Sequence, residues 1–228
     1  LEGGPGGSAL STLDFWFTSA LRESRDIILI DQRGTGFSRP SLNCPEIEDA
    51  RLDDPTLACR DRLLAAGVDL NAYRSTQSAA DIDALIAALD YQQVNLYGVS
   101  YGTRLALTVM RDYPQRIRSV ILDAVYPPQV NSLNEQALNA DRALQTLFEG
   151  CAKDARCNAA YPNLRQVFYE TVDRLNESPL IVPDFEGDEY ELYGDDLADE
   201  LFDLLYDTSM IPLLPGMIYR AYEGDGEG

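Results

Sequence analysis

The sequence predicts an α/β fold in which a mostly parallel sheet is flanked by helices and is followed by a helical segment. Short apolar runs at 26–30, 93–98 and 117–123 have the length and the β-branched content of buried strands. Helical patterns at 75–91 and 100–114 alternate with the later runs. Such alternation is typical of parallel strands whose connecting helices cover both faces of a sheet.

Two loops precede and separate these elements, and the pattern becomes mainly helical after residue 130. Residues 2–8 are rich in glycine and form a loop, and residues 31–40 are a turn-rich loop after the first strand. We expect residues 41–74 to be polar and irregular. After residue 130 the only strand pattern is 180–183, and the rest reads as helices, at 134–150, 162–177, 195–207 and 213–222. The chain therefore divides into an α/β part, 1–128, and a helical part, 129–228.

The charge balance excludes some partners. The 228 residues include 38 acidic and 18 basic ones, which gives a net charge of −20. Nucleic acid is not an expected partner, because phosphate binding needs a basic face. The excess is explained by a solvated surface, or alternatively by an acidic vestibule that attracts a cationic group such as a peptide amine. No apolar run is long enough to predict a membrane span.

Four cysteines fall into two local pairs, Cys44 with Cys59 and Cys151 with Cys157. An even count in short-range pairs favours two small disulfides and an oxidising compartment. Four reduced and buried thiols are the alternative. A metal site is not predicted, because no C-x2-C spacing occurs and the sequence contains no histidine.

The segment Gly98-Val99-Ser100-Tyr101-Gly102 has the pattern of a nucleophile elbow. It lies between a predicted strand and a predicted helix, which is the context that this motif requires. Ser100 must then occupy a sharp turn, and glycine at 98 and 102 removes side chains that would collide there. The helix that follows directs its free N–H groups at developing negative charge. Ser100 is therefore the candidate nucleophile.

The glycine-rich loop can supply the second part of an acyl-transfer site. Two backbone donors must hold the oxyanion, and one is the N–H of Tyr101, the residue after the nucleophile. For the other we select Gly4, with Gly3 as second choice. A phosphate-binding loop is the alternative, but no G-K-[ST] pattern follows, and Pro5 removes one donor.

Three further polar residues have mainly structural interpretations. Asp31 and Arg33 directly follow the first strand, and we expect them to support the loops around Ser100 rather than to contact substrate. Asp123 ends the strand after the elbow helix. It is a candidate for the catalytic acid, although a strand-end residue that caps a turn is the favoured interpretation.

Together, "GGPGGS", "DQRGTGFS" and "YGVSYGTRLAL" resemble the motifs of the α/β-hydrolase fold, in order and at fitting separations. More narrowly, they resemble the prolyl iminopeptidase and tripeptidyl aminopeptidase family. The stretch around Cys151 and Cys157 is similar to the cap segment of its secreted branch. The resemblance covers most of residues 1–180. Glu2 departs from it, since many relatives have histidine before the glycines.

The resemblance implies that residues 1–128 are the N-terminal part of a hydrolase core and that residues 129–228 are a helical cap. It places the triad acid and histidine in the last part of the fold, beyond residue 228. We therefore expect both ends of this sequence to be cut, and we expect an N-terminal fragment that is nearly inactive alone. No metal or organic cofactor is implied.

The implied activity is that of a serine exopeptidase, an aminopeptidase that acts through an acyl-enzyme on peptides with a free N-terminus. Acidic residues of the cap, such as Glu135, Asp141 and Glu149, are candidates to bind that amine, although a solvated helix face explains each one singly. A carboxylesterase or lipase is the enzymatic alternative, and a binding module without catalysis is the other. The cysteines and the resemblance imply a secreted or periplasmic protein. The sequence does not define the oligomeric state.

Overall fold

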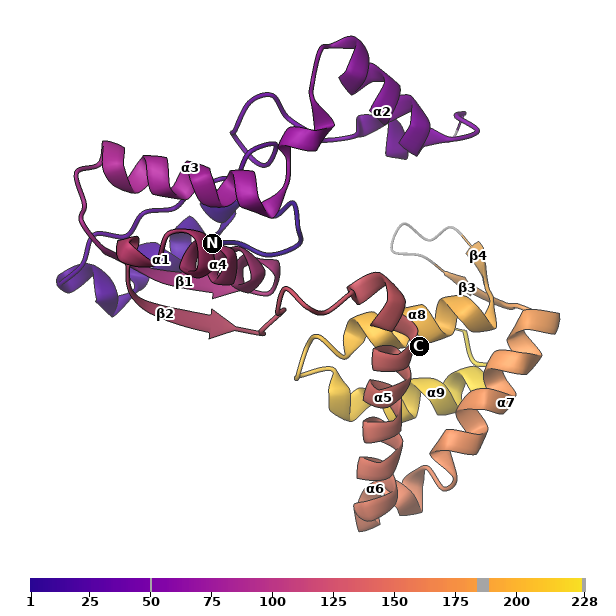
Figure 1. Cartoon of the computed structure of the whole chain (residues 1–228). Coiled ribbons are helices and arrows are strands. Elements are labelled where there is room, and N and C mark those ends of the chain that lie inside the picture. Colours follow the sequence, from indigo (N-terminus) through magenta and orange to yellow (C-terminus); the bar gives the residue numbers. More distant parts are fainter. Residues whose placement is uncertain (50, 184–188, 227–228) are drawn as a thin grey trace. The chain divides into compact units, whose positions relative to one another are not determined.

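The structure is a computed structural model that describes residues 1–49, 51–183 and 189–226 (Figure 1). The chain forms two compact units, Leu1–Val130 and Asn131–Gly228. The sequence-based boundary lies between residues 128 and 129, and the last two residues of its second part are outside the described ones. The assignment of the two parts to a core and a cap remains a prediction.

A small parallel sheet forms the centre of the first unit. Strand β1 (Val94–Val99) pairs with β2 (Ile117–Asp123), and Leu96 lies opposite Val120. On the other edge of β1, the Leu1 nitrogen donates to the Tyr97 carbonyl at 2.7 Å. The Val99 N–H donates to the Leu1 carbonyl at 3.1 Å. Leu1 therefore extends the sheet by one residue with the hydrogen-bond pattern of a parallel neighbour.

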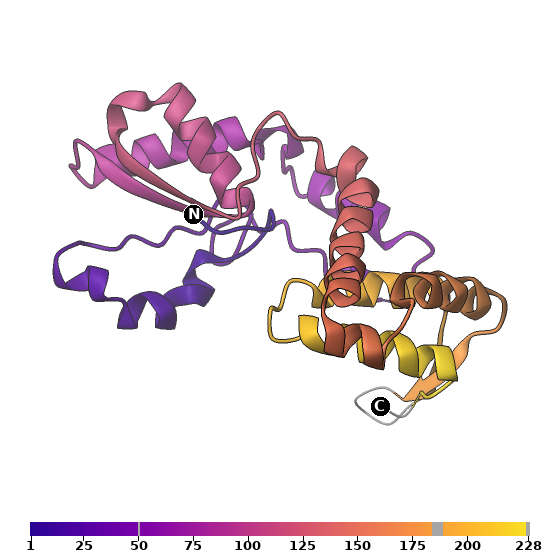
Figure 2. The same ribbon diagram turned by 90° about the horizontal axis from the view of Figure 1, so that it is seen from below.

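Helices pack on the sheet from both sides. Helix α4 (Tyr101–Asp112) joins the two strands and packs on them, and α3 (Ser75–Ala88) packs on α4. The shared core consists of apolar side chains, namely Ala79, Ile82, Ile86, Leu96, Leu105, Ala106 and Val109. On the other side of the strands lies the short helix α1 (Leu13–Thr18) (Figure 2). Its Trp16 contacts the Tyr97 ring. The predicted alternation of helices and parallel strands at 75–123 is confirmed.

The prediction of a strand at 26–30 is wrong. These residues have no ladder partner among the described residues, and Ile28 is exposed. A strand exists only where a second backbone pairs with it. The edge of β1 that faces away from β2 is met by Leu1. The apolar run is therefore coil in this structure.

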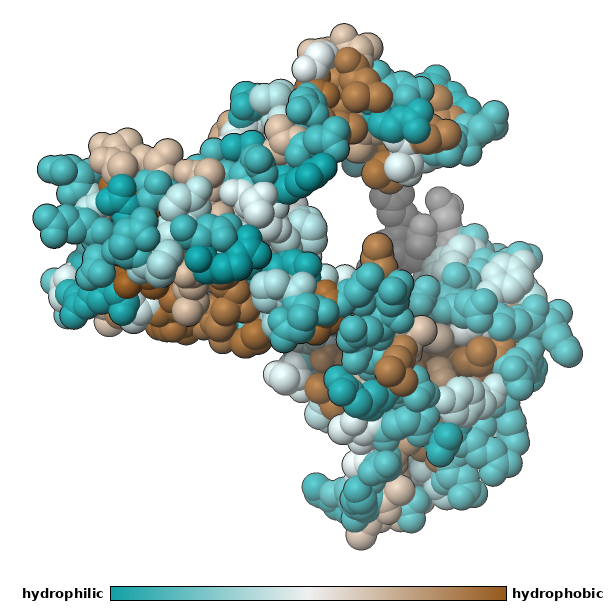
Figure 3. Space-filling model, in the orientation of Figure 1, coloured by the Kyte–Doolittle hydropathy of each residue, from teal (hydrophilic) through white to brown (hydrophobic). Residues whose placement is uncertain are grey.

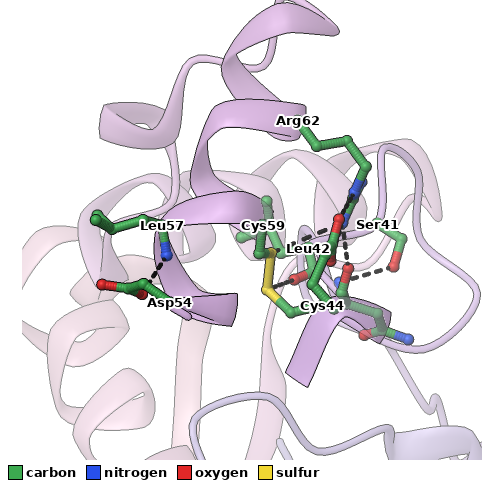
Figure 4. The surroundings of a disulfide bond; sticks show 9 residues. Ser41, Leu42, Cys44, Asp54, Leu57, Cys59 and Arg62 are labelled. Carbon is green, nitrogen blue, oxygen red and sulfur yellow. Dashed lines mark hydrogen bonds and ion pairs between the residues drawn. A yellow bond between two sulfur atoms is a disulfide. The ribbon is translucent and has the colours of Figure 1, made fainter. Parts of the chain in front are cut away.

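The prediction that residues 41–74 are irregular is also wrong in part. Helix α2 spans Pro55–Ala65, and the Asp54 carboxylate accepts from the Leu57 N–H at 2.8 Å as its N-cap. The Cys44–Cys59 disulfide closes the segment (Figure 4). Cys59 also belongs to a small buried core with Leu63. Residue 50 lies outside the described residues. The short 3-10 helices of this unit are Ala9–Thr12, Ala20–Glu23, Pro45–Glu48, Leu70–Ala72 and Pro114–Arg116.

The second unit is mainly helical, as predicted. Its helices are α5 (Ser132–Lys153), α6 (Ala155–Ala160), α7 (Leu164–Glu177), α8 (Gly194–Leu204) and α9 (Leu214–Glu223), with a 3-10 turn at Ile211–Leu213. They share a core that includes Phe148, Phe168, Leu175, Leu201 and Ile218. The Cys151–Cys157 disulfide joins α5 to α6, so both predicted disulfides are present.

Two strands complete the second unit. Strand β3 (Leu180–Pro183) was predicted, and it pairs antiparallel with β4 (Glu189–Leu192), which was not. The run Glu-Tyr-Glu-Leu has too few apolar residues to indicate a buried strand. Residues 131–228 contain 21 acidic and 6 basic residues, and hydrophilic colour covers most of the visible face of this unit (Figure 3).

Candidate active site

Ser100 occupies a strained turn between β1 and α4. Its backbone angles are φ 53° and ψ −120°, a combination that residues other than glycine rarely adopt. The Ser100 N–H donates to the Asp123 carbonyl at 2.8 Å. The Ser100 carbonyl accepts from the Thr103 N–H at 2.9 Å and from the Thr103 hydroxyl at 2.6 Å. The main chain of Ser100 is thus held on both sides.

Glycine is required on both sides of this turn. A Cβ atom at Gly98 would lie 2.5 Å from the Gly102 carbonyl oxygen, and one at Gly102 would lie 2.0 Å from the Leu1 carbonyl oxygen. Both contacts are with backbone, which cannot move aside as a flexible side chain can. The pattern of residues 98–102 therefore follows from close backbone approach rather than from contact with the Ser100 side chain.

The glycine loop lies against Ser100. A Cβ atom at Gly3 would lie 3.0 Å from the Ser100 Cβ and 3.5 Å from its Oγ. The Gly3 N–H donates to the Glu2 carboxylate at 3.1 Å. Gly4 has φ +106°. Among the residues that the structure describes, the N–H groups of Gly4 and Tyr101 have no acceptor. The N–H groups of Gly4 and Tyr101 are thus free to bind an oxyanion in the described structure, as are those of Gly6 and Gly102, whereas that of Gly3 is paired.

Asp31 and Gln32 hold the two ends of the glycine loop. The Gln32 side-chain amide donates to the Glu2 carbonyl at 3.1 Å, before the glycines. After them, the Ser8 hydroxyl donates to the Asp31 carboxylate at 2.8 Å, and the Leu10 N–H donates to it at 3.3 Å. Gln32 was missed in the sequence, although it lies inside a motif that was recognised. Side-chain bonds to carbonyls leave no periodic signal that could have indicated it.

The environment of Asp31 favours its charged form. Burial opposes the charge, but hydrogen bonds from the Phe37 N–H, the Ser8 hydroxyl and the Leu10 N–H outweigh it and hold the pKa below its ordinary value. A Cβ atom at Gly36 would lie 2.1 Å from the Asp31 carboxylate, so this turn also depends on glycine. Asp31 is thus a buried residue whose carboxylate holds neighbouring loops in place.

The partners of Arg33 are Asp81 and Ala72, not Ser100. Its guanidinium makes a bidentate ion pair with Asp81 of α3, at 2.7 and 2.6 Å, and donates to the Ala72 carbonyl at 2.6 Å. The ion pair raises the pKa of Arg33, chiefly through the hydrogen bonds to Asp81. These contacts connect the loop at 31–40 to α3, and each of the three guanidinium nitrogens donates a hydrogen bond in them.

The carboxylate of Asp123 binds the Tyr97 hydroxyl at 2.7 Å. This hydrogen bond raises the pKa of Tyr97. In the described part of the chain, no hydrogen bond joins Asp123 to the Ser100 hydroxyl. The contacts of Asp123 thus correspond to those of a strand-end residue, with its carbonyl on Ser100 and its carboxylate on Tyr97.

One group of residues has the composition of a metal site. Sulfur atoms of Cys44 and Cys59 and a carboxylate oxygen of Glu46 lie within 4.8 Å of one another. The two sulfurs are joined in a disulfide (Figure 4), and Glu46 forms an ion pair with Arg62. This group is therefore explained by its own bonds. Within the described residues, no helix has the length and apolar character needed to cross a membrane.

The comparisons with known proteins agree with this architecture. A family model described as the alpha/beta hydrolase fold matches residues 1–180. Since this is more than half of the 228 residues, the chain belongs to the α/β-hydrolase fold family.

Several curated relatives are named as hydrolases or peptidases. YuaR of Escherichia coli, named as a hydrolase, is 27% identical over 98% of this chain and 47% of its own length. The serine protease Hip1 of Mycobacterium tuberculosis is 29% identical over 80% of this chain and 39% of its own length. A tripeptidyl aminopeptidase of Streptomyces coelicolor is 30% identical over 67% of this chain and 32% of its own length. The chain thus spans less than half the length of each of these relatives.

Proposed function

We propose that Ser100 is the nucleophile of a serine exopeptidase, an aminopeptidase that releases N-terminal residues or short peptides through an acyl-enzyme. The observation that carries the proposal is the conformation of Ser100, a strained turn between a parallel strand and a helix. This is the context of a nucleophile elbow. Strain at a single serine, maintained by glycines at 98 and 102, is typical of functional sites.

In the proposed reaction, the Ser100 hydroxyl attacks the scissile carbonyl carbon and its proton passes to a histidine. The histidine then gives this proton to the leaving amine, and an ester joins Ser100 to the acyl part. Water cleaves that ester and restores the hydroxyl. The N–H groups of Tyr101 and Gly4 hold the oxyanion, a role supported by their lack of other acceptors in the described chain. Gly3, Asp31 and Arg33 support the loops, and no cofactor takes part.

The histidine of this mechanism comes from outside the 228 residues, since the sequence contains no histidine. We place the acid outside them as well, because the carboxylate of Asp123 binds the Tyr97 hydroxyl. The greater length of the relatives supports this part of the proposal. The 228-residue chain alone is then nearly inactive, because loss of a triad member leaves only a small residual rate in this chemistry.

The peptide substrate is supported by the names of two relatives, a serine protease and a tripeptidyl aminopeptidase. The second unit is the helical cap of the hydrolase, and its acidic excess attracts the free amine of a peptide. The two disulfides support a secreted, periplasmic or cell-envelope location.

The test uses the complete natural protein. A fluorophosphonate should label Ser100, and the Ser100→Ala variant should not be labelled. Peptides with a free amine should be cleaved, whereas the same peptides with an acetylated amine should not. Cleavage of acyl esters together with blocked peptides would instead identify an esterase or lipase. Absence of labelling would contradict catalysis and favour a binding module.

A further inference from the structure

The segment that follows β2, residues 124–130, is attached to the first turn of α4. We call these residues the linker, because the chain enters the second unit directly after them. The Tyr126 N–H donates to the Thr103 hydroxyl at 2.7 Å, and this hydroxyl donates to the Ser100 carbonyl at 2.6 Å. One buried side chain thus connects the linker to the turn that holds Ser100.

Arg104, the next residue of α4, binds the rest of the linker. One terminal nitrogen donates to the Val130 carbonyl at 3.1 Å and reaches the Pro127 carbonyl at 3.5 Å. The other donates to the Pro128 carbonyl at 3.0 Å. The guanidinium carbon also lies 4.7 Å from the centroid of the Tyr126 ring. These contacts match the planar, multi-donor shape of arginine and its affinity for aromatic faces.

Regular secondary structure does not hold the linker in its conformation. It is neither helix nor strand, and Pro127 and Pro128 have no N–H to donate. The Val130 N–H donates to the Pro127 carbonyl at 3.1 Å, which makes a single turn. Three carbonyl groups of the linker, those of Pro127, Pro128 and Val130, therefore converge on one charged donor. Hydrogen bonds to a charged group are stronger than those between neutral groups.

We propose that Arg104 is a positioning residue that fixes the point where the chain leaves the first unit, and that it thereby sets the affinity for peptide substrates. It does not touch the reacting atoms, and it acts through residues 126–130. The part that concerns affinity rests on the proposed function, in which the second unit contributes to peptide binding. The part that concerns the linker rests on the contacts alone.

The test compares Arg104→Met with Arg111→Met in the complete natural protein. Arg111 is the matched control, because it lies on the same helix and, among the described residues, its guanidinium binds only the neighbouring Asp112 carboxylate, at 2.6 and 2.8 Å. Hydrogen–deuterium exchange of the amides in 124–131 should become about tenfold faster in Arg104→Met and should stay unchanged in Arg111→Met.

Kinetics provide the second readout. In Arg104→Met, KM for a free-amine peptide should rise about tenfold, while kcat and the rate of fluorophosphonate labelling should stay within about twofold. Arg104→Lys should lie between the wild type and Arg104→Met, because a lysine can bind fewer carbonyls at once. It also provides the comparison if Arg104→Met does not fold.

Two results would overturn the inference. One is unchanged exchange of 124–131 in both Arg104 variants, and the other is a fall of kcat and of labelling in step with the rise of KM. Absence of labelling in the wild type would refute the proposed function instead, and the exchange data would still decide whether Arg104 holds the linker.

Discussion

Alanine at position 102 should destabilise the first unit, although alanine is normally favourable in a helix. The added Cβ atom would lie 2.0 Å from the Leu1 carbonyl oxygen. An ordinary carbon–oxygen contact is about 3.3 Å or longer. Leu1 would therefore have to move away from α4 by more than about 1 Å. That oxygen accepts from the Val99 N–H, and the Leu1 nitrogen donates to the Tyr97 carbonyl, so the movement disrupts both hydrogen bonds.

The magnitude follows from these contacts. Two lost hydrogen bonds cost about 2 kcal/mol, and overpacking of a close contact costs about 1–3 kcal/mol. Helix propensity offsets about 1 kcal/mol of this loss. We expect the Gly102→Ala variant to lose about 2–4 kcal/mol of unfolding free energy. Gly150→Ala is the control, because Gly150 is exposed in the interior of α5 and no atom lies within 4 Å of its added Cβ.

Urea unfolding of the 228-residue chain can separate the two variants. The single tryptophan, Trp16, contacts Tyr97, so its fluorescence follows unfolding of the first unit. Gly102→Ala should lower the midpoint of the fluorescence transition. Gly150→Ala should leave this midpoint unchanged. It should raise the free energy of unfolding of the second unit, followed by helical circular dichroism, by about 1 kcal/mol. An unchanged fluorescence midpoint in Gly102→Ala would refute the close approach of Leu1 to α4.

Two further outcomes follow from the structure. Replacing Cys44 and Cys59 by serine should cost about 3 kcal/mol, and replacing Cys151 and Cys157 should cost about 2 kcal/mol, because the closed loop is longer in the first case; the sequence separations are 15 and 6. Urea midpoints of the two double-serine variants, each compared with the wild type with and without reductant, measure the two losses. Equal losses in the two variants would contradict the predicted order. Asp31 has a lowered pKa in the folded state, so its contribution to stability is complete above its unfolded pKa of about 3.9 and is lost as the pH falls through the folded value. Asp31→Asn should therefore show a smaller loss of stability between pH 6 and pH 2 than the wild type, and equal losses would refute this assignment.

The Ser100 turn could be predicted because its cause is local. Two glycines around a serine, after an apolar run and before a helical pattern, leave few conformations to the backbone. The helices of the second unit were equally accessible, since their apolar residues recur at helical spacing. The missed helix α2 also had a local signal, an aspartate before a proline, which indicates an N-cap followed by the first helical residue.

Other features depend on contacts between distant residues and leave no trace in a local pattern. The apolar run at 26–30 satisfies every local criterion for a strand, yet pairing needs a partner that the local sequence does not specify. Gln32 and Arg104 bind carbonyl groups, which every residue has, so the identity of the partner residue is not constrained. The contact of Gly3 with Ser100 joins residues almost a hundred positions apart. A motif indicated its existence, but only the fold shows which glycine is nearest.

The hydrogen bonds of Ser100 described above all involve its main chain, on the Asp123 carbonyl and the Thr103 hydroxyl and N–H. The turn is therefore built without help from the Ser100 side chain. The side chain at position 100 can therefore be changed while the backbone turn stays the same. A diaminopropionic acid residue there should adopt the same backbone geometry. Its acyl adduct would be an amide, which is hydrolysed much more slowly than an ester, so a transient adduct would become one that can be isolated. Substrates captured in this way from a natural peptide mixture could be read out by mass spectrometry.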